Sequence, residues 1–198
     1  MKKLAYAFID ASNLFYGGEK SLGWKIDYRK LIKYIKKKYL VKKVFYYGGV
    51  ELDGFPYSIL DNKPINLKKL INYLKLKSAD EVKAIARIKF YLKLAEFGYL
   101  LQLKPVKIFH ESDGRISKKA NCDVDMTFNL MRYLNEYSEV LILSGDGDFA
   151  IVLKYLMQLG KKVTVLARGE RTAREIRQLA GKNFRDFNYL RELIKFGT

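Results

Sequence analysis

The feature that most constrains the fold is an alternation of short apolar runs with amphipathic helical segments. Residues 4–10, 41–50 and 139–145 are rich in β-branched and aromatic side chains and have the length of strands. Residues 27–39 instead place apolar side chains on one helical face and lysines on the other. Strands that alternate with helices form parallel sheets covered on both faces. The sequence therefore predicts an α/β protein, a three-layer α/β/α sandwich around a mostly parallel sheet of about five strands.

The same patterns predict where each element lies. Strands are expected at residues 4–10, 41–50, 100–109, 139–145 and 161–167. Helices are expected at residues 27–39, 66–77, 80–98, 124–137, 148–160 and 172–181.

We expect one domain over residues 1–198, since the chain has the length of a single α/β domain. The connection between the second and third strands is longer than one crossover helix needs. This predicts an insertion at about 51–88, specific to this protein. For the wider region 51–99, two interpretations stay open, a contact within a homodimer or a lid over a substrate.

The charge of the chain is strongly one-sided. Lysine and arginine number 38 against 21 aspartate and glutamate residues, a formal net charge of +17. Such an excess repels itself and is typical of a protein with an anionic partner, of which nucleic acid is the first candidate. An origin at high temperature would explain many charges, but it explains their one-sidedness less well. No segment has the length of a membrane span, so we expect a soluble cytoplasmic protein without a membrane partner.

Five aspartates are expected to meet at one edge of the sheet. Asp10 ends the first strand, and Asp146 and Asp148 directly follow the fourth. Asp123 and Asp125 begin the helix that follows the third strand. In open α/β sheets the active crevice lies beyond the carboxyl ends of the strands. Since carboxylates held together raise one another's pKa, and Mg²⁺ prefers oxygen ligands, the grouping predicts a divalent-metal site.

Each acid also has a simpler interpretation. Asp148 precedes an apolar helix and is a suitable N-cap, and Asp125 lies in a first helical turn, where the helix dipole favours a carboxylate. An Asp-Gly-Asp sequence is as often a turn as a ligand. Asp10 is the hardest to explain in this way, because a carboxylate that closes a buried strand is costly unless it is paired. The combination in this strand order is a stronger signal than any single residue.

Three motifs in order resemble a known family. FIDASNL (8–14), NCDVDMTFNLM (121–131) and LILSGDGDF (141–149) are similar to the NYN domain, specifically the LabA-like (DUF88) group of the PIN-like nuclease superfamily. Residues 89–109 resemble a further segment of that group, so the likeness covers nearly the whole chain. The resemblance implies a PIN-like α/β/α sandwich and a nuclease that depends on Mg²⁺ or Mn²⁺ and acts on RNA.

The resemblance also implies roles for individual residues. It makes four acids catalytic metal ligands, namely Asp10, Asp125, Asp146 and Asp148. The family's helix often carries another carboxylate where this chain has Asn129, and Asp123 is the candidate substitute among the metal ligands. Asn13 and Ser144 match the motifs as polar supports.

Two groups of basic residues are candidates for contacts with nucleic acid. Arg168, Arg171 and Arg174 follow the fifth strand at spacings of three, and arginine binds two phosphate oxygens at once. Lys118 and Lys119 precede the helix that carries Asp123 and Asp125. The alternative for the arginines is a solvated helix face.

The sequence predicts a metal-dependent ribonuclease that hydrolyses RNA phosphodiesters with a metal-activated water. The alternative is a non-catalytic RNA-binding or regulatory module on the same fold. A phosphatase of the haloacid-dehalogenase type would need a second aspartate where this chain has Ser12. A Rossmann dinucleotide site is disfavoured, because no glycine-rich loop follows the first strand, and no GxxxxGK[ST] motif exists for a P-loop NTPase.

Overall fold

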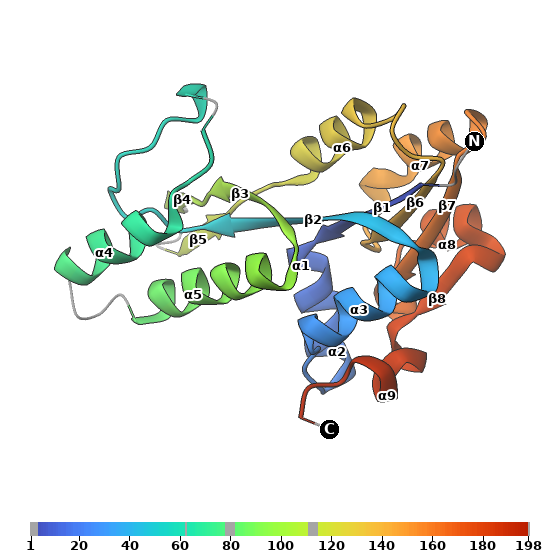
Figure 1. The fold of residues 1–198 in the computed structure, drawn as a ribbon, viewed down its shortest axis with the longest axis horizontal. Coiled ribbons are helices and arrows are strands. Elements are labelled where there is room, and N and C mark those ends of the chain that lie inside the picture. Colours follow the sequence, from blue (N-terminus) through green and yellow to red (C-terminus); the bar gives the residue numbers. More distant parts are fainter. Residues whose placement is uncertain (1–3, 62, 78–81, 111–114, 198) are drawn as a thin grey trace.

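A computed structural model describes residues 4–61, 63–77, 82–110 and 115–197 of the chain. Its centre is a six-stranded sheet in the order β3-β2-β1-β6-β7-β8, and every neighbouring pair of strands in it is parallel (Figure 1). The strands of this sheet are β1 (Ala5–Asp10), β2 (Val41–Val50), β3 (Leu100–Pro105), β6 (Glu139–Leu143), β7 (Lys162–Ala167) and β8 (Phe184–Asp186).

Helices cover both faces of the sheet. In Figure 1, α6 and α7 lie above the sheet and α3 and α5 below it. The α-helices are α1 (Ala11–Asn13), α2 (Lys20–Leu22), α3 (Tyr28–Tyr39), α4 (Leu67–Lys77), α5 (Val82–Phe97), α6 (Asp123–Arg132), α7 (Ala150–Gln158), α8 (Arg174–Ala180) and α9 (Arg191–Ile194). Shorter turns of other kinds are the π-helix η1 (Leu14–Glu19) and the 3-10 turns η2 (Ile59–Asp61), η3 (Gly147–Phe149), η4 (Gly169–Arg171), η5 (Gly181–Asn183) and η6 (Phe187–Leu190).

The central strand β1 shows why the sheet is buried on both faces. Ala7 and Ile9 point into a core shared with α3, α4, α5 and α9. Tyr6 and Phe8 point the other way, into a second core shared with α6, α7 and α8. Alternate side chains of a strand lie on opposite faces, so a strand covered on both sides must be apolar throughout. The predicted α/β/α sandwich with a mostly parallel sheet is confirmed, with six strands in place of about five.

The predicted strand at residues 100–109 is wrong in its extent. The chain leaves the main sheet at Pro105, whose nitrogen has no proton to donate to a strand ladder. Beyond it, β4 (Lys107–His110) pairs antiparallel with β5 (Ile116–Lys119) in a separate two-stranded sheet. The sixth strand of the main sheet, β8, was not predicted. It has only three residues, and its middle residue is an exposed arginine.

The helix predicted at residues 124–137 ends earlier, at Arg132. The chain turns over the next residues, and Lys161 holds the turn by donating from Nζ to the carbonyl oxygens of Leu134 and Tyr137, each at 2.8 Å. The Tyr137 hydroxyl donates to the carbonyl oxygen of Leu130 at 2.8 Å. These distant partners satisfy carbonyl groups at the helix end, which local periodicity does not reveal.

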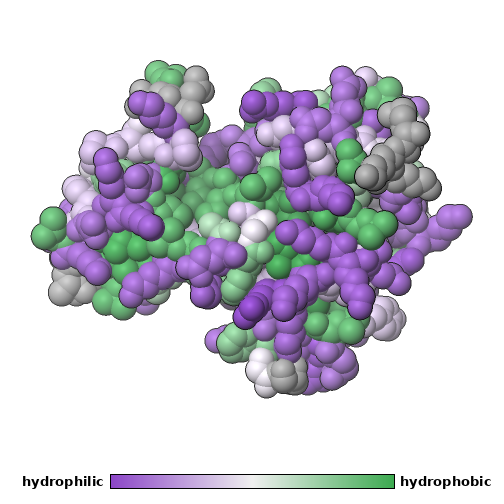
Figure 2. All heavy atoms as spheres, viewed as in Figure 1, coloured by the Kyte–Doolittle hydropathy of each residue, from purple (hydrophilic) through white to green (hydrophobic). Residues whose placement is uncertain are grey.

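The region after β2 forms a lobe at one end of the molecule. It consists of an irregular segment up to residue 66 and the helices α4 and α5, which pack together (Figure 1). The predicted helix at residues 80–98 corresponds to α5, and its first residues lie outside the described part of the chain. In Figure 2 apolar side chains gather in a hollow between this lobe and the rest of the surface.

Among the described residues, no helix is long and apolar enough to cross a membrane. The homodimer, the cytoplasmic location and the single domain with an insertion stay predictions.

Replacing Phe8 by alanine tests the second core. Phe8 is fully buried, and its ring stacks on Phe45 at a centroid distance of 5.1 Å. We expect Phe8→Ala to lower the free energy of unfolding by about 3–5 kcal/mol, because the core cannot refill the cavity. Chemical denaturation measures this loss. The control Tyr189→Ala removes a side chain that is 85% exposed and should change it by less than about 0.5 kcal/mol. A loss below about 1 kcal/mol for Phe8→Ala would contradict this packing.

Candidate metal centre

The parallel pairing of β1 with β6 brings two site residues together at the carboxyl edge of the sheet. Ile9 pairs with Leu143, so Asp10 and Ser144, the next residue of each strand, are neighbours. The Ser144 hydroxyl donates to Asp10 Oδ2 at 3.3 Å. Asp10 Oδ1 accepts from the backbone N–H groups of Ser12 at 2.9 Å and Asn13 at 3.3 Å, and so caps the helical segment that follows β1.

Asp10 is a buried carboxylate with an altered pKa. Its residue is 8% exposed, and burial raises the pKa to about 6. The hydrogen bonds from Asn13, Ser12 and Ser144 act in the opposite direction, and the nearby charge of Asp123 raises the pKa further. The carboxylate that was hardest to explain from sequence therefore has three hydrogen-bond donors, and it joins β1 to the start of the next loop.

Asn13 and Ser144 support the loop that carries the acidic pair. Asn13 Oδ1 accepts from the backbone N–H of Gly145 at 2.9 Å, and Ser144 Oγ accepts from that of Asp146 at 3.3 Å. Gly145 has no room for a side chain, because a Cβ there would lie 2.9 Å from Thr172 Cα. The loop is thus fixed from two sides, and both predicted supports contact it.

Three acids form the cluster at this edge. One carboxylate oxygen each of Asp123, Asp146 and Asp148 lies within 4.8 Å of the other two. Asp146 Oδ1 accepts from the backbone N–H of Asp148 at 3.0 Å, which fixes the turn between them. Burial raises the pKa of Asp123, and the charges of Asp146 and Asp148 raise it further. Carboxylates that disfavour one another's ionisation at this spacing suit a divalent cation with oxygen ligands.

Asp125 lies on another side of α6. It follows Asp123 by two residues, which is a rotation of about 200° around a helix. Its Oδ2 accepts from Lys104 Nζ at 2.6 Å, and both side chains are partly exposed. Among the acids predicted as metal ligands, the structure brings Asp146 and Asp148 together with Asp123, the candidate substitute. It does not bring Asp10 or Asp125 into that group of three.

Asn129 lies one helical turn beyond Asp125 and is buried. It lies beside the Tyr47 hydroxyl, whose pKa burial raises above its usual range. Its amide is therefore close to the core and on the side of α6 that faces away from the acidic cluster.

The basic residues predicted to contact nucleic acid do not form one surface. Arg168 is only 12% exposed in its side chain, and it forms ion pairs with Asp186 at 3.2 Å and Glu170 at 2.8 Å. This geometry ties the end of β7 to β8 and leaves little of Arg168 for a phosphate. Arg171 and Arg174 are exposed nearby.

Lys118 and Lys119 lie on β5, which is near the β3 edge of the main sheet, whereas β8 forms the opposite edge. Lys118 is exposed and forms an ion pair with Glu51 at 2.6 Å, and Lys119 is exposed.

Sequence reasoning missed Lys104. It lies near the end of β3, pairs with Asp125, and its charge lowers the pKa of Asp123. The available signal was its position directly before Pro105, inside the mostly apolar stretch predicted as a strand at residues 100–109. A cation at that edge is the electrostatic complement of the acids on the neighbouring helix.

The protein is an α/β/α sandwich with a carboxylate cluster beyond the carboxyl ends of its parallel strands. The sequence profile of the NYN domain matches residues 5–188, and the chain therefore belongs to the NYN domain family. The resemblance found in the three motifs is thereby confirmed.

Several known proteins are similar to this chain. The chain is 28% identical over 191 residues to the low amplitude and bright protein LabA of Synechococcus elongatus, covering 95% of this chain and 86% of LabA. A crystal structure of a Vibrio parahaemolyticus protein of unknown function shares the fold, with a TM-score of 0.61, 20% identity and 93% of both chains covered. A more distant likeness is to T5 5'-exonuclease with bound zinc, with a TM-score of 0.46, 17% identity, and 88% of this chain and 60% of that one covered.

The raised pKa of Asp10 predicts a pH dependence of stability in protein freed of metal. The folded-state pKa of about 6 exceeds the unfolded value of about 3.9, so the folded protein holds this proton more tightly. The stabilising contribution is complete below about pH 4 and is lost as the pH rises through about 6, a difference of roughly 2–3 kcal/mol. Urea denaturation between pH 4 and 7 measures it. Asp10→Asn keeps a side chain that can cap the helix and should lack this component; an unchanged pH profile in that variant would contradict the assignment.

The acidic cluster predicts stabilisation by divalent cations. A cation at 100 times its dissociation constant should raise the free energy of unfolding by about 2.7 kcal/mol, because it binds only the folded protein. Thermal unfolding with and without Mn²⁺ or Mg²⁺ measures the effect. Asp123→Asn and Asp146→Asn should lose it, and Glu192→Gln on α9, an exposed acid away from the cluster, should keep it. Asp125→Asn decides between the family pattern and the geometry: its full loss of the effect would make Asp125 a ligand after all.

Proposed function

We propose that the protein is a metal-dependent nuclease that hydrolyses RNA phosphodiester bonds, most simply as an endoribonuclease. The observation that carries this proposal is the cluster of Asp123, Asp146 and Asp148 at the carboxyl edge of the sheet, in a chain of the NYN domain family. The net charge of +17 supports a polyanionic substrate. The acidic cluster is therefore a negatively charged spot in a basic protein. A bound cation, rather than the substrate, would balance its negative charge.

The donor set fits Mg²⁺ or Mn²⁺. Three carboxylates, with no histidine among them and a spacing that lets one ion reach all of them, are the ligands that such hard cations prefer. When bound, the ion would supply a water of lowered pKa and would neutralise charge on the phosphodiester. Asp123 would hold it from α6, and Asp146 and Asp148 would hold it from the loop after β6.

The remaining residues have supporting roles in this proposal. Asp148 is the most exposed of the three acids, and its carboxylate would also orient the attacking water. Asp10 positions the loop through Ser144, and its charge acts on the cluster. Asp125 holds Lys104 beside the cluster, where the ammonium group can meet a substrate phosphate. Arg171 and Arg174 are exposed and free to extend that contact along a nucleic acid.

A second candidate function is a non-catalytic RNA-binding or regulatory module on the same fold. The specific observation in its favour is that Asp125 is engaged by Lys104 rather than joined to the other acids. In that case the cluster would hold an ion for structure or regulation, and the basic surface alone would carry the function.

Cleavage of end-labelled RNA and DNA, single- and double-stranded, separates these candidates. The wild-type protein should cut RNA with Mn²⁺ or Mg²⁺ and not with EDTA. Asp146→Asn should lower the cleavage rate by at least about 100-fold. Loss of a residue that only supports a metal ligand typically costs about 10- to 100-fold in activity, and loss of the ligand itself should cost no less. Glu192→Gln, purified in the same way, should cut like the wild type.

Two results would count against the nuclease. Equal cutting by wild type and Asp146→Asn would mean that a contaminant does the cutting. No cutting, together with tight and salt-sensitive RNA binding, would favour the binding module.

A further inference from the structure

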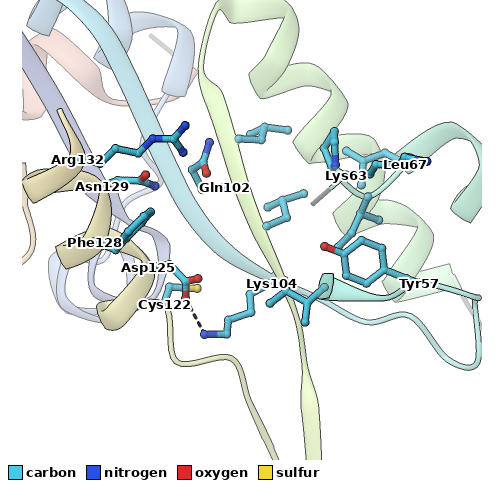
Figure 3. A pocket seen from close by; sticks show the side chains of 15 residues that line it. Tyr57, Lys63, Leu67, Gln102, Lys104, Cys122, Asp125, Phe128, Asn129 and Arg132 are labelled. Atoms are coloured by element: carbon cyan, nitrogen blue, oxygen red, sulfur yellow. Dashed lines mark hydrogen bonds and ion pairs between the residues drawn. The ribbon is translucent and has the colours of Figure 1, made fainter. Parts of the chain in front are cut away.

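A groove of about 510 Å³ lies beside the acidic cluster, on the other side of α6. Figure 3 shows its shape: α6 forms one wall, residues from the ranges 57–59 and 63–67 form the other, and β3 lies between them. The walls come from parts of the chain far apart in sequence, and the second wall belongs to the region for which the sequence left a homodimer contact and a substrate lid as open interpretations. The side chains that matter for its chemistry are Tyr57, Lys63, Gln102, Lys104, Phe128 and Arg132.

The charge of the groove is positive. Lys63, Lys104 and Arg132 line it, and Asp125 is the one carboxylate among the described residues of its lining. That carboxylate is already neutralised by Lys104 at 2.6 Å. Two cations on opposite walls, Lys63 and Arg132, therefore remain to attract an anion, and both are exposed. Phosphate groups spaced along a chain suit cations placed in this way.

The groove also presents a large apolar side chain to solvent. Phe128 is 61% exposed although it lies on a helix that packs against the core, and Figure 3 places it on the α6 wall. Tyr57 lies on the opposite wall and is half-buried. Gln102 on β3 offers an amide that can both donate and accept hydrogen bonds. Exposed aromatic rings beside cations are the usual platform for unpaired bases, because every base has a face that stacks.

Lys104 links the groove to the acidic cluster electrostatically. Lys104 pairs with Asp125 at the groove, and its charge also lowers the pKa of Asp123 in the cluster. The first turn of α6 thus faces the cluster with Asp123 and the groove with Asp125.

We propose that this groove binds a single-stranded segment of the nucleic acid, with an unpaired base on Phe128 and phosphates at Lys63 and Arg132. The proposal deepens the nuclease function and rests on it. The volume lies within the roughly 300–1,000 Å³ of sites that enclose small ligands, which accommodates individual bases and not a duplex. Bases in a duplex are stacked on each other and cannot stack on Phe128, so the groove selects unpaired substrate.

Binding measured without catalysis tests the groove. Fluorescence anisotropy in EDTA would follow a labelled 12-nucleotide single-stranded RNA, the same DNA sequence, and the blunt duplex of that RNA. Phe128→Ala should weaken single-strand binding by about tenfold, as expected for one lost stacking contact. Arg132→Gln should weaken it and make it less sensitive to salt. Duplex binding should change less than about twofold in both variants.

Matched controls use side chains of the same kind elsewhere. Phe196→Ala removes a phenylalanine that is 63% exposed near the C-terminus, and Arg191→Gln removes an exposed arginine of α9. Both should bind like the wild type. Because Phe128 and Arg132 are exposed, their variants should unfold at the wild-type temperature, and the two substitutions test the groove independently.

The outcomes separate the groove from the nuclease. Wild-type single-strand affinity in both Phe128→Ala and Arg132→Gln would overturn the groove even if the protein cuts RNA. An equal loss for single strands and duplex would also overturn it, since unpaired bases would then not be what Phe128 contacts. A selective single-strand loss supports the groove, and it does so even if no cleavage is found and the nuclease proposal fails.

Discussion

The hydrogen bonds accepted by the buried carboxylate of Asp10 are the interaction on which the rest of the site depends. One oxygen holds the backbone at the start of α1, and the other accepts from Ser144 at the end of β6. Asn13, in the helix that Asp10 caps, then fixes Gly145, and Ser144 fixes Asp146. A carboxylate buried at this position is costly, as its pKa of about 6 shows, and the hydrogen bonds offset only part of that cost. The fold thus keeps an unfavourable buried carboxylate at the place where the acidic loop begins.

The helix α6 separates two surfaces, the acidic cluster and the groove. Its first turn directs Asp123 toward Asp146 and Asp148, and directs Asp125 toward Lys104 and the groove. One side is negative and suits a cation, and the other is positive and suits phosphate. Because Lys104 acts on both aspartates, the two sides are electrostatically coupled. A polyanion in the groove and a cation in the cluster would stabilise each other, and under the proposed function this would couple substrate binding to metal binding.

The sequence was sufficient for a mostly parallel sheet covered on both faces and for the edge at which the acids lie, but not for the end of β3 or for the short strand β8. Uniformly apolar strands must be buried on both faces, and parallel strands bring their carboxyl ends together, so the place of Asp10 and Asp146 at one edge of the sheet was predictable. It was not sufficient for the choice between Asp123 and Asp125, which depends on the rotation of α6 about its own axis. The sequence predicts Arg168 as a phosphate contact because its partner Asp186 lies in a strand of three residues, which is too short to recognise from sequence. The groove could not be predicted from the sequence, because one of its walls is an irregular segment without helical or strand periodicity.

The most direct test of the central claim, that Asp123, Asp146 and Asp148 hold a divalent cation, is X-ray diffraction from crystals of the protein soaked in Mn²⁺. Anomalous scattering locates manganese without any assumption about its ligands. We predict a single strong peak at the sheet edge, coordinated by carboxylate oxygens of those three residues. A peak held by Asp10 and Asp125 without Asp123, or no peak at that edge in crystals with full access to the ion, would contradict the account.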